Sequence, residues 1–202
     1  MGNPRIGILG GTFDPVHSGH LTAAINVRYE LDLDSVLLVV ANQPWQKVGA
    51  RPVTAAPDRL ALVQAAVEAY DGLAASDLEI ERGGISYTAD TIAELARTYP
   101  GVELHLIIGA DVAGQLGTWV RLEEVRRAVT LVVVNRPGTR KVQPGSGGPL
   151  AGWRVAMVEI PALEISSTDL RDRAAAGRPL DFLMPPESIR MLRRRNLYVD
   201  DR

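Results

Sequence analysis

Two histidines near the start of the chain have the residue type and spacing to do chemistry. His17 and His20 are two of only three histidines in the 202-residue sequence, and both lie in the stretch GGTFDPVHSGH at residues 10–20. A spacing of three lets both side chains lie over one helical turn and face the same ligand. Gly10 and Gly11 let the backbone approach a ligand closely, and the start of a helix offers N–H groups and a partial positive charge. The stretch therefore predicts a phosphate-binding loop, with a structural turn and a zinc site that includes Asp14 as the alternatives.

A strand before this loop and a helix after it would position it. The apolar run 6–9 predicts a short buried strand, and an apolar face over 21–31 predicts a helix with Ser18 as its N-cap. The alternating run 78–81 predicts a weaker strand near an edge, followed by a loop at 83–87. Further buried strands are expected at 35–41, 104–108, 130–134 and 154–160. Helices are expected over 54–70 and 88–99, capped by Thr54 and Thr88, and over 121–127, 165–177 and from 185 onwards.

This alternation of strands and helices predicts an α/β fold: a Rossmann-like, doubly wound, mostly parallel sheet with helices on both faces. We expect a single domain over 1–202, with a helical C-terminal portion at about 165–198. The Gly- and Pro-rich segment 139–152 predicts a mobile loop. Ligands in such sheets bind beyond the carboxyl ends of the strands. The unusual features of the sequence gather there: 10–20, 42–47, 109–111, Arg136 and the turn at Ser166.

Composition narrows the class of protein. The chain is 46% hydrophobic with a formal net charge of −2, so no general nucleic-acid-binding surface is indicated. It has no cysteine, which excludes disulfides and thiolate chemistry and is compatible with a reducing, cytoplasmic location. No signal peptide and no apolar run long enough for a membrane span are present, so no membrane partner is expected. The oligomeric state is not determined by the sequence, and a homo-oligomer stays open.

The loop at 10–20 lacks the patterns of the two common nucleotide-binding loops. It has neither the Gly-Lys-Ser/Thr ending of a Walker loop nor the spacing of a dinucleotide fingerprint. With the second stretch ISSTDLR at 165–171, it resembles the two signatures of the nucleotidyltransferase superfamily that carries a His-x-Gly-His motif. Within that superfamily the chain resembles the bacterial nicotinate-nucleotide adenylyltransferases in the segments 87–91, 107–111, 135–138, 183–185 and 196–198, and at Trp119. It departs from them at 44–47, where Pro-Trp-Gln-Lys stands in place of their frequent Pro-His-Lys or Pro-His-Arg.

The resemblance implies adenylyl transfer from ATP to nicotinate mononucleotide, giving deamido-NAD and pyrophosphate in NAD biosynthesis. It implies catalytic roles for His17, His20 and Arg171, and Mg²⁺ that is carried by ATP, with no metal ligand from protein side chains. The nicotinate mononucleotide is expected to contact Asn42, Lys47, Thr88, Trp119 and Arg136. ATP is expected to contact both histidines, Arg171, Gly10, Gly11, Thr12, Phe13, Gly109, Asp111, Ile165, Ser166, Ser167 and Thr168.

Four rival functions stay open on the sequence alone. Phosphopantetheine adenylyltransferases share both signatures, but typically have Thr at the position of His17 and a shorter chain. FMN adenylyltransferases and cytidylyltransferases share the first motif and match the segment 87–91, Trp119 and the Ser166 turn less well. A non-catalytic nucleotide-sensing module is the alternative of a different class, and the intact His17, His20, Ser167 and Arg171 argue against it. His105 lies in an apolar strand and is interpreted as structural.

Overall fold

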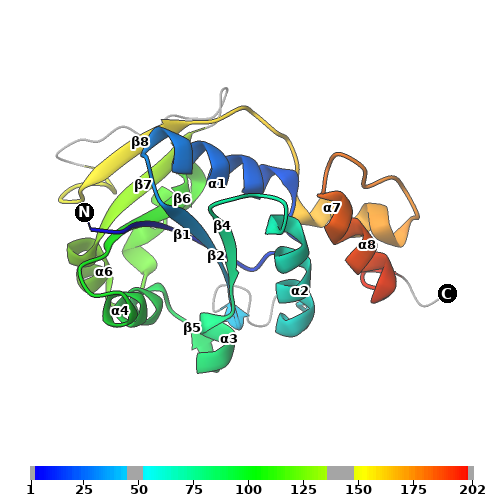
Figure 1. Ribbon diagram of the computed structural model, residues 1–202, viewed down its shortest axis with the longest axis horizontal. Helices are drawn as coiled ribbons and strands as arrows, with labels where there is room; N and C mark the ends of the chain where they lie inside the picture. Colours follow the sequence, from blue (N-terminus) through cyan, green and yellow to red (C-terminus); the bar gives the residue numbers. More distant parts are fainter. Residues whose placement is uncertain (1–2, 45–51, 136–147, 200–202) are drawn as a thin grey trace.

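A six-stranded parallel sheet forms the centre of the molecule (Figure 1). The computed structural model describes residues 3–44, 52–135 and 148–199. Lys47, Arg136, the departure from the family at Trp45 and Gln46, and residues 139–147 of the predicted mobile loop lie outside the described residues. The strand order is β4-β2-β1-β6-β7-β8, and every neighbouring pair is parallel. The strands are β1 (Arg5–Gly11), β2 (Ser35–Val40), β4 (Leu73–Ser76), β6 (Glu103–Gly109), β7 (Val129–Asn135) and β8 (Val155–Glu159). The chain runs outward from β1 to β4, crosses back to β6 and continues to β8, which confirms the predicted doubly wound fold.

Helices cover both faces of this sheet (Figure 1). One face carries α1 and α2, and the other carries α4 and α6. A separate two-stranded parallel sheet pairs β3 (Gln43–Pro44) with β5 (Ile85–Ser86), so the predicted loop at 83–87 contains a short strand. The helices are α1 (Ser18–Glu30), α2 (Ala56–Val67), α3 (Leu78–Arg82), α4 (Thr88–Thr98), α5 (Ala110–Ala113), α6 (Leu122–Ala128), α7 (Ser167–Ala175) and α8 (Pro186–Arg194), with a 3₁₀ turn η2 at Leu116–Thr118.

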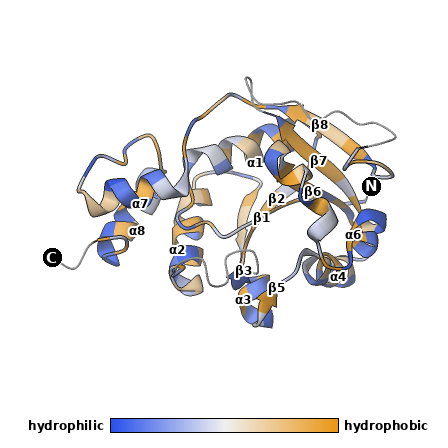
Figure 2. Cartoon of the chain, turned by 180° about the vertical axis from the view of Figure 1, so that it is seen from behind, coloured by the Kyte–Doolittle hydropathy of each residue, from blue (hydrophilic) through white to orange (hydrophobic). Residues whose placement is uncertain are grey.

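Two hydrophobic cores lie on opposite faces of the sheet. In β7, Leu131 and Val133 pack with α4 and α6, whereas Val132 and Val134 pack with α1 and α2. Successive side chains of a strand point to opposite faces, so a strand covered on both sides must be apolar throughout. Figure 2 shows this pattern as strongly hydrophobic central strands inside helices with hydrophilic outer faces. The continuous apolar runs of the sequence are therefore explained.

The predicted edge strand at 78–81 is wrong. These residues form the helix α3. The edge strand is β4, which pairs with β2 and begins at Leu73, five residues before the predicted start at residue 78. The alternation of apolar and charged residues misled because Glu79 is buried on this helix, where its carboxylate accepts a hydrogen bond from Thr91 Oγ1 at 2.5 Å. A run of four or five residues is too short to separate a helical from a strand period.

The helix starts differ from the predicted caps by one position. Ser18 is the first residue of α1 and not its cap, and its hydroxyl donates to the Phe182 carbonyl at 2.9 Å. Helix boundaries are the least certain part of any sequence-based assignment, since the capping residue depends on the backbone geometry at the turn. The observed N-caps of α1, α2 and α4 are His17, Ala55 and Tyr87, where Ser18, Thr54 and Thr88 were predicted.

The C-terminal helices α7 and α8 join the core on the side of α2 (Figure 1). Ser188 on α8 is buried, and its hydroxyl donates to the Leu62 carbonyl of α2 at 2.8 Å. Ile189 packs in the same apolar cluster as Leu62. Arg195, just after α8, forms an ion pair with Asp58 in the first turn of α2, at 2.5 Å. None of the helices in the described residues is long and apolar enough to span a membrane.

Candidate active site

The first loop leaves the sheet at the point where the strand order reverses. Gly10 is exposed at the end of β1, and a Cβ placed on it would meet no atom within 4 Å. A Cβ on Gly11 would instead lie 2.9 Å from the ring of Phe13, which is buried with a positive φ of 49°. The ring therefore needs the glycine beneath it, and Gly10 leaves open space in which a ligand can approach the backbone.

The two histidines lie face to face at the start of α1. Their rings stack with centroids 3.7 Å apart, and the His20 and Phe13 rings form a T-shaped pair with centroids 5.0 Å apart. The main-chain N–H of His17 donates to Nδ1 of His20 at 3.2 Å. Because Nδ1 accepts this hydrogen bond, the neutral His20 ring carries its proton on Nε2, which makes Nε2–H a donor. A donor of this kind suits a phosphate oxygen.

The second motif lies against the first loop, although the two are far apart in the sequence. Ser167 Oγ donates to the Pro15 carbonyl at 2.8 Å across a separation of 152 residues. Arg171 donates through Nη1 to the Asp14 carbonyl at 2.7 Å and through Nη2 to Thr168 Oγ1 at 3.0 Å. Ser166 is the N-cap of α7, as its oxygen accepts from the Asp169 N–H. The fold thus brings both predicted ATP-binding motifs into one place, with Ile165 half-buried beside them.

The C-terminal tail also holds this loop. The Tyr198 hydroxyl donates to Asp14 Oδ1 at 2.8 Å, and Asp14 is buried. Burial raises the pKa of Tyr198 well above its ordinary value, so its hydroxyl stays a donor. Both residues lie in motifs of the sequence, but the sequence predicted neither of them as part of the nucleotide site. No group of three or more metal-ligating side chains lies within the described ranges 3–44, 52–135 and 148–199.

The end of β6 lies next to the first loop at the carboxyl edge of the sheet. Gly109 is the last residue of β6, and Asp111 is exposed in the first turn of α5. A Cβ on Gly109 would collide with Oδ1 of Asp111, so the carboxylate lies over the glycine. Only glycine at this position allows that carboxylate to fold back over the strand end. An exposed carboxylate there can accept hydrogen bonds from ribose hydroxyl groups.

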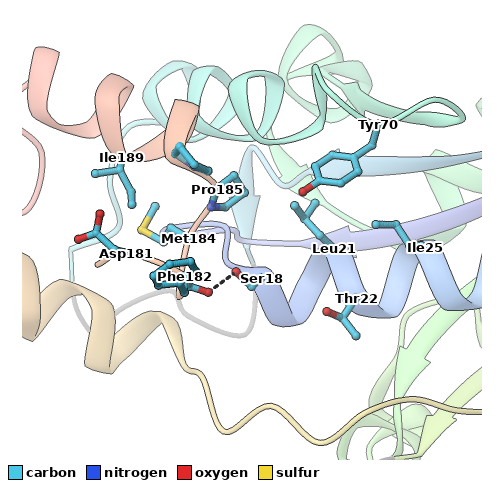
Figure 3. A pocket seen from close by; sticks show the side chains of 11 residues that line it. Ser18, Leu21, Thr22, Ile25, Tyr70, Asp181, Phe182, Met184, Pro185 and Ile189 are labelled. Atoms are coloured by element: carbon cyan, nitrogen blue, oxygen red, sulfur yellow. Dashed lines mark hydrogen bonds between the residues drawn. The ribbon is translucent and has the colours of Figure 1, made fainter. Parts of the chain in front are cut away.

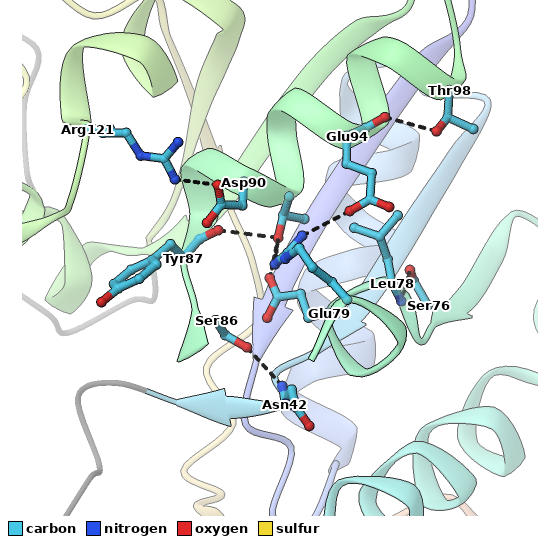
Figure 4. A network of polar contacts seen from close by, with 12 residues as sticks. Asn42, Ser76, Leu78, Glu79, Ser86, Tyr87, Asp90, Glu94, Thr98 and Arg121 are labelled. Carbon is cyan, nitrogen blue, oxygen red and sulfur yellow. Dashed lines mark hydrogen bonds and ion pairs between the residues drawn. The ribbon is translucent and has the colours of Figure 1, made fainter. Parts of the chain in front are cut away.

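Asn42 organises the neighbouring part of the crevice, after β2. Its main-chain N–H donates to Ser86 Oγ at 2.9 Å, as Figure 4 shows, and its side-chain amide donates to the Gly84 carbonyl at 2.9 Å. These bonds continue the pairing of β3 with β5. Asn42 therefore fixes the segment that leads into Thr88 and α4, and its amide N–H is engaged in that contact.

Trp119 is held near Thr88 by an ion pair. Arg121, with a left-handed φ of 54°, donates to Asp90 Oδ1 at 2.5 Å in the first turn of α4 (Figure 4). Thr88 begins the same helix. The Trp119 side chain packs partly on the core, and its buried Nε1 has no hydrogen-bond partner among the described residues. The Arg121–Asp90 ion pair joins the segment just after Trp119 to the first turn of α4, which begins at Thr88.

A second hollow lies between α1 and the segment before α8 (Figure 3). Leu21 and Ile25 of α1 face Met184 and Ile189 across it, with Tyr70 at one end. Asp181 is the one charged side chain among its described lining residues. An apolar hollow with an acidic rim does not suit a triphosphate. The polar residues gathered at the carboxyl edge of the sheet are the better candidate for the site.

Two residues at this edge were missed by sequence reasoning. Arg59 is buried on α2 and donates to three main-chain carbonyls around the crevice. Its signal was a cation on the apolar face of a predicted helix, three residues before the buried Leu62. Asn135 ends β7 and is buried, and its Oδ1 has no partner within the described part of the chain. Its signal was a polar residue closing an apolar strand.

A doubly wound sheet with a phosphate-binding loop at its switch point defines a class of nucleotide-binding α/β proteins. The model of the cytidylyltransferase-like family matches residues 8–173, which include the loop at 10–20 and the motif at 165–171. A probable nicotinate-nucleotide adenylyltransferase of Corynebacterium kroppenstedtii is 43% identical over 196 residues, covering 97% of this chain and 92% of that protein. The chain belongs to the cytidylyltransferase-like family and, within it, to the family of the nicotinate-nucleotide adenylyltransferases.

Other relatives agree with this placement. A probable nicotinate-nucleotide adenylyltransferase of Streptomyces coelicolor is 42% identical over 190 residues, covering 94% of this chain and 98% of that protein. Among solved structures, the Plasmodium falciparum nicotinic acid mononucleotide adenylyltransferase complexed with NaAD superposes with a TM-score of 0.78. That match has 17% identity and covers 97% of this chain and 98% of the other, so it supports the fold.

Proposed function

We propose that the protein transfers the adenylyl group of ATP to nicotinate mononucleotide, forming deamido-NAD and pyrophosphate in NAD biosynthesis. One observation carries this proposal: Ser167 and Arg171 donate hydrogen bonds to the carbonyls of Pro15 and Asp14, so that both nucleotidyltransferase motifs border one crevice. The names of the relatives supply the acceptor.

The proposed reaction is a displacement at the α-phosphorus of ATP. A phosphate oxygen of the mononucleotide forms the new P–O bond, the bond to the bridging oxygen breaks, and pyrophosphate leaves. Because the attacking group is already an anion, the protein needs no nucleophile and must mainly position two polyanions and stabilise the developing charge. Mg²⁺ would arrive with ATP, held by phosphate oxygens and water.

The ATP side of the crevice has donors suited to this charge. His20 would donate from Nε2–H to the α-phosphate in the transition state, and His17, stacked on it, would contact the same phosphates. Arg171 would supply a guanidinium, held in place by Asp14 and Thr168. Main-chain groups at 10–13 and the start of α7 would complete the cradle, and Gly109 and Asp111 would border the adenosine.

The mononucleotide side would recognise the pyridine ring and its carboxylate. Trp119 would stack on the ring, and Thr88 with the N–H groups at the start of α4 would receive the carboxylate. Donors without a full counter-ion favour the acid over the amide through charge recognition. Lys47 and Arg136 stay predictions as phosphate ligands, since both lie outside the described residues.

An acceptor panel tests the proposal. The protein is incubated with ATP, Mg²⁺ and one acceptor at a time: nicotinate mononucleotide, its amide, phosphopantetheine or FMN. Pyrophosphate release is measured. We expect turnover with nicotinate mononucleotide above the other three, and no turnover with it would refute the proposal.

The variant His20→Ala tests the assigned catalytic group. We expect turnover to fall about 100-fold or more, as for the loss of one transition-state donor. Thermal stability should change little by comparison, because the His20 ring is half-buried. A loss of turnover that merely follows a loss of folded protein would assign His20 a structural role.

A further inference from the structure

Arg59 is a charged side chain outside the two motifs whose three hydrogen bonds reach three separate parts of the main chain near the candidate site. It lies on α2, and its side chain is almost completely buried. Nη1 donates to the Thr12 carbonyl at 2.6 Å, Nη2 to the Asn42 carbonyl at 3.1 Å, and Nε to the Thr54 carbonyl at 2.7 Å. A single planar guanidinium therefore joins three separate pieces of main chain.

These pieces belong to the two halves of the candidate site. Thr12 lies in the first loop, between the two glycines and the histidines. Asn42 follows β2 and holds Ser86 and Gly84, which lead into Thr88 and α4. Arg59 thus bonds to the ATP side and to the mononucleotide side with two nitrogens of one rigid group. Covalent geometry fixes the distance between those two nitrogens, so the guanidinium resists any change in the separation of the Thr12 and Asn42 segments.

The charge of Arg59 is expensive to bury. Burial lowers the pKa of the Arg59 guanidinium, and the nearby Asp14 carboxylate opposes this shift. A buried ion pair is often replaceable by apolar side chains with no loss of stability. Stability alone therefore does not explain a guanidinium here, whereas the need for several donors in a fixed plane does.

We propose that Arg59 is a positioning residue that sets the separation of the first loop from the Asn42 segment, and so aligns the attacking phosphate with the α-phosphorus of ATP. This inference rests on the proposed two-substrate reaction. In-line attack depends on the distance between two separately bound substrates, and a misplacement of about 1 Å can cost about 100-fold in rate. Arg59 acts through the loops it holds, so its loss changes kcat more than the affinity for either substrate.

Two substitutions and one control test this inference. Arg59→Met removes the donors and keeps the length of the side chain, and Arg59→Lys keeps the charge without the planar fork. Leu62→Ala is the control, because Leu62 is buried one turn further along the same helix and belongs to the apolar core. For each folded variant, kcat, both KM values and the Kd for ATP are measured with the acceptor that the wild type uses.

We expect both Arg59 variants to lose about 100-fold in kcat, with KM and Kd values within about threefold of the wild type. The Leu62→Ala variant should keep the kcat of the wild type when each protein is assayed at the same number of degrees below its own Tm. Rescue by lysine would mean that charge and not geometry matters, and would overturn the inference. An equal loss of kcat in Leu62→Ala, or a loss confined to ATP affinity, would overturn it as well.

Hydrogen exchange gives a readout that does not depend on the substrate. Amides of 10–20 should exchange faster in Arg59→Met than in the wild type, and should be unchanged in Leu62→Ala. If the wild type did not use nicotinate mononucleotide, the proposed function would fail while this comparison still tested Arg59. Unchanged exchange at 10–20 in Arg59→Met would refute the positioning role itself.

Discussion

Replacing Gly10 and Gly11 one at a time by alanine would separate the two roles of glycine in the first loop. The added methyl group on Gly11 would lie 2.9 Å from the Phe13 ring, whereas ordinary contacts of a Cβ lie at 3.4–4 Å. Phe13 is buried at 2% exposure, so its ring has little room to move away. The same methyl group on Gly10 would meet nothing within 4 Å. The two substitutions are chemically identical and adjacent, and the structure predicts opposite consequences.

For Gly11→Ala we expect an overpacking cost of about 1–3 kcal/mol. In a chain of this length, each kcal/mol lowers Tm by about 2–4 °C, so Tm should fall by about 2–12 °C. Because the centroids of the Phe13 and His20 rings lie 5.0 Å apart, displacement of the Phe13 ring should also move His20 and lower kcat. For Gly10→Ala we expect a change in unfolding free energy within about 0.5 kcal/mol.

Gly10→Ala should instead act on ATP. Its methyl group would occupy the space through which the triphosphate approaches the backbone, and a clash of about 1.4 kcal/mol raises the KM for ATP about tenfold. Thermal unfolding and steady-state kinetics on both variants measure the two effects. An equal fall of Tm in the two variants, or an unchanged KM for ATP in Gly10→Ala, would refute this account of the loop.

Three further predictions follow from single contacts. Trp119→Ala should remove about 1–3 kcal/mol of stacking and raise the KM for nicotinate mononucleotide about 5- to 150-fold, with ATP binding intact. A larger effect on ATP binding would place Trp119 in the other half of the site. Tyr198→Phe should lower the free energy of unfolding in urea by about 1.5–3 kcal/mol, since its hydroxyl donates to the buried Asp14 carboxylate, whereas the exposed control Tyr99→Phe should be neutral. Burial lowers the pKa of His105, so its contribution to stability is present above the unfolded pKa of about 6.5 and is lost as pH falls through the folded pKa. His105→Gln should therefore weaken the pH dependence of the urea midpoint between about pH 7 and 5. An unchanged pH dependence would contradict this.

Much of the fold could be predicted because local patterns carried it. The apolar runs at 35–41, 104–108 and 130–134 became β2, β6 and β7, since strands covered on both faces have no polar positions to hide their period. The edge strand β4 could not be found, because its sequence Leu-Ala-Ala-Ser has little β-propensity and pairs only through β2. The run at 78–81 alternates apolar and charged residues like an edge strand, but its charged residue Glu79 is buried on a helix.

The candidate site divides in the same way. Residue types and spacing within 10–20 predicted phosphate binding, and the resemblance to a known signature extended that prediction to 165–171. The structure places the two stretches in direct contact. The proton position on His20 could not be predicted, because it depends on a main-chain N–H three residues away whose direction is set by the turn. Asn42 stays a prediction as a ligand, and the hydrogen bond from its side-chain amide to the Gly84 carbonyl could not be read from the sequence.

The sequence by itself determined the class of fold, the two motifs of the family at 10–20 and 165–171 and the residue types available in them, because each is encoded in a short stretch of chain. Only the tertiary structure decided how the motifs meet. Contacts of Arg171 with Asp14, of Tyr198 with Asp14 and of Arg59 with Thr12 join residues 157, 184 and 47 positions apart. No local pattern encodes such pairs, because they form only when the parallel strands bring their carboxyl ends, and the helices packed on them, to the same edge of the sheet.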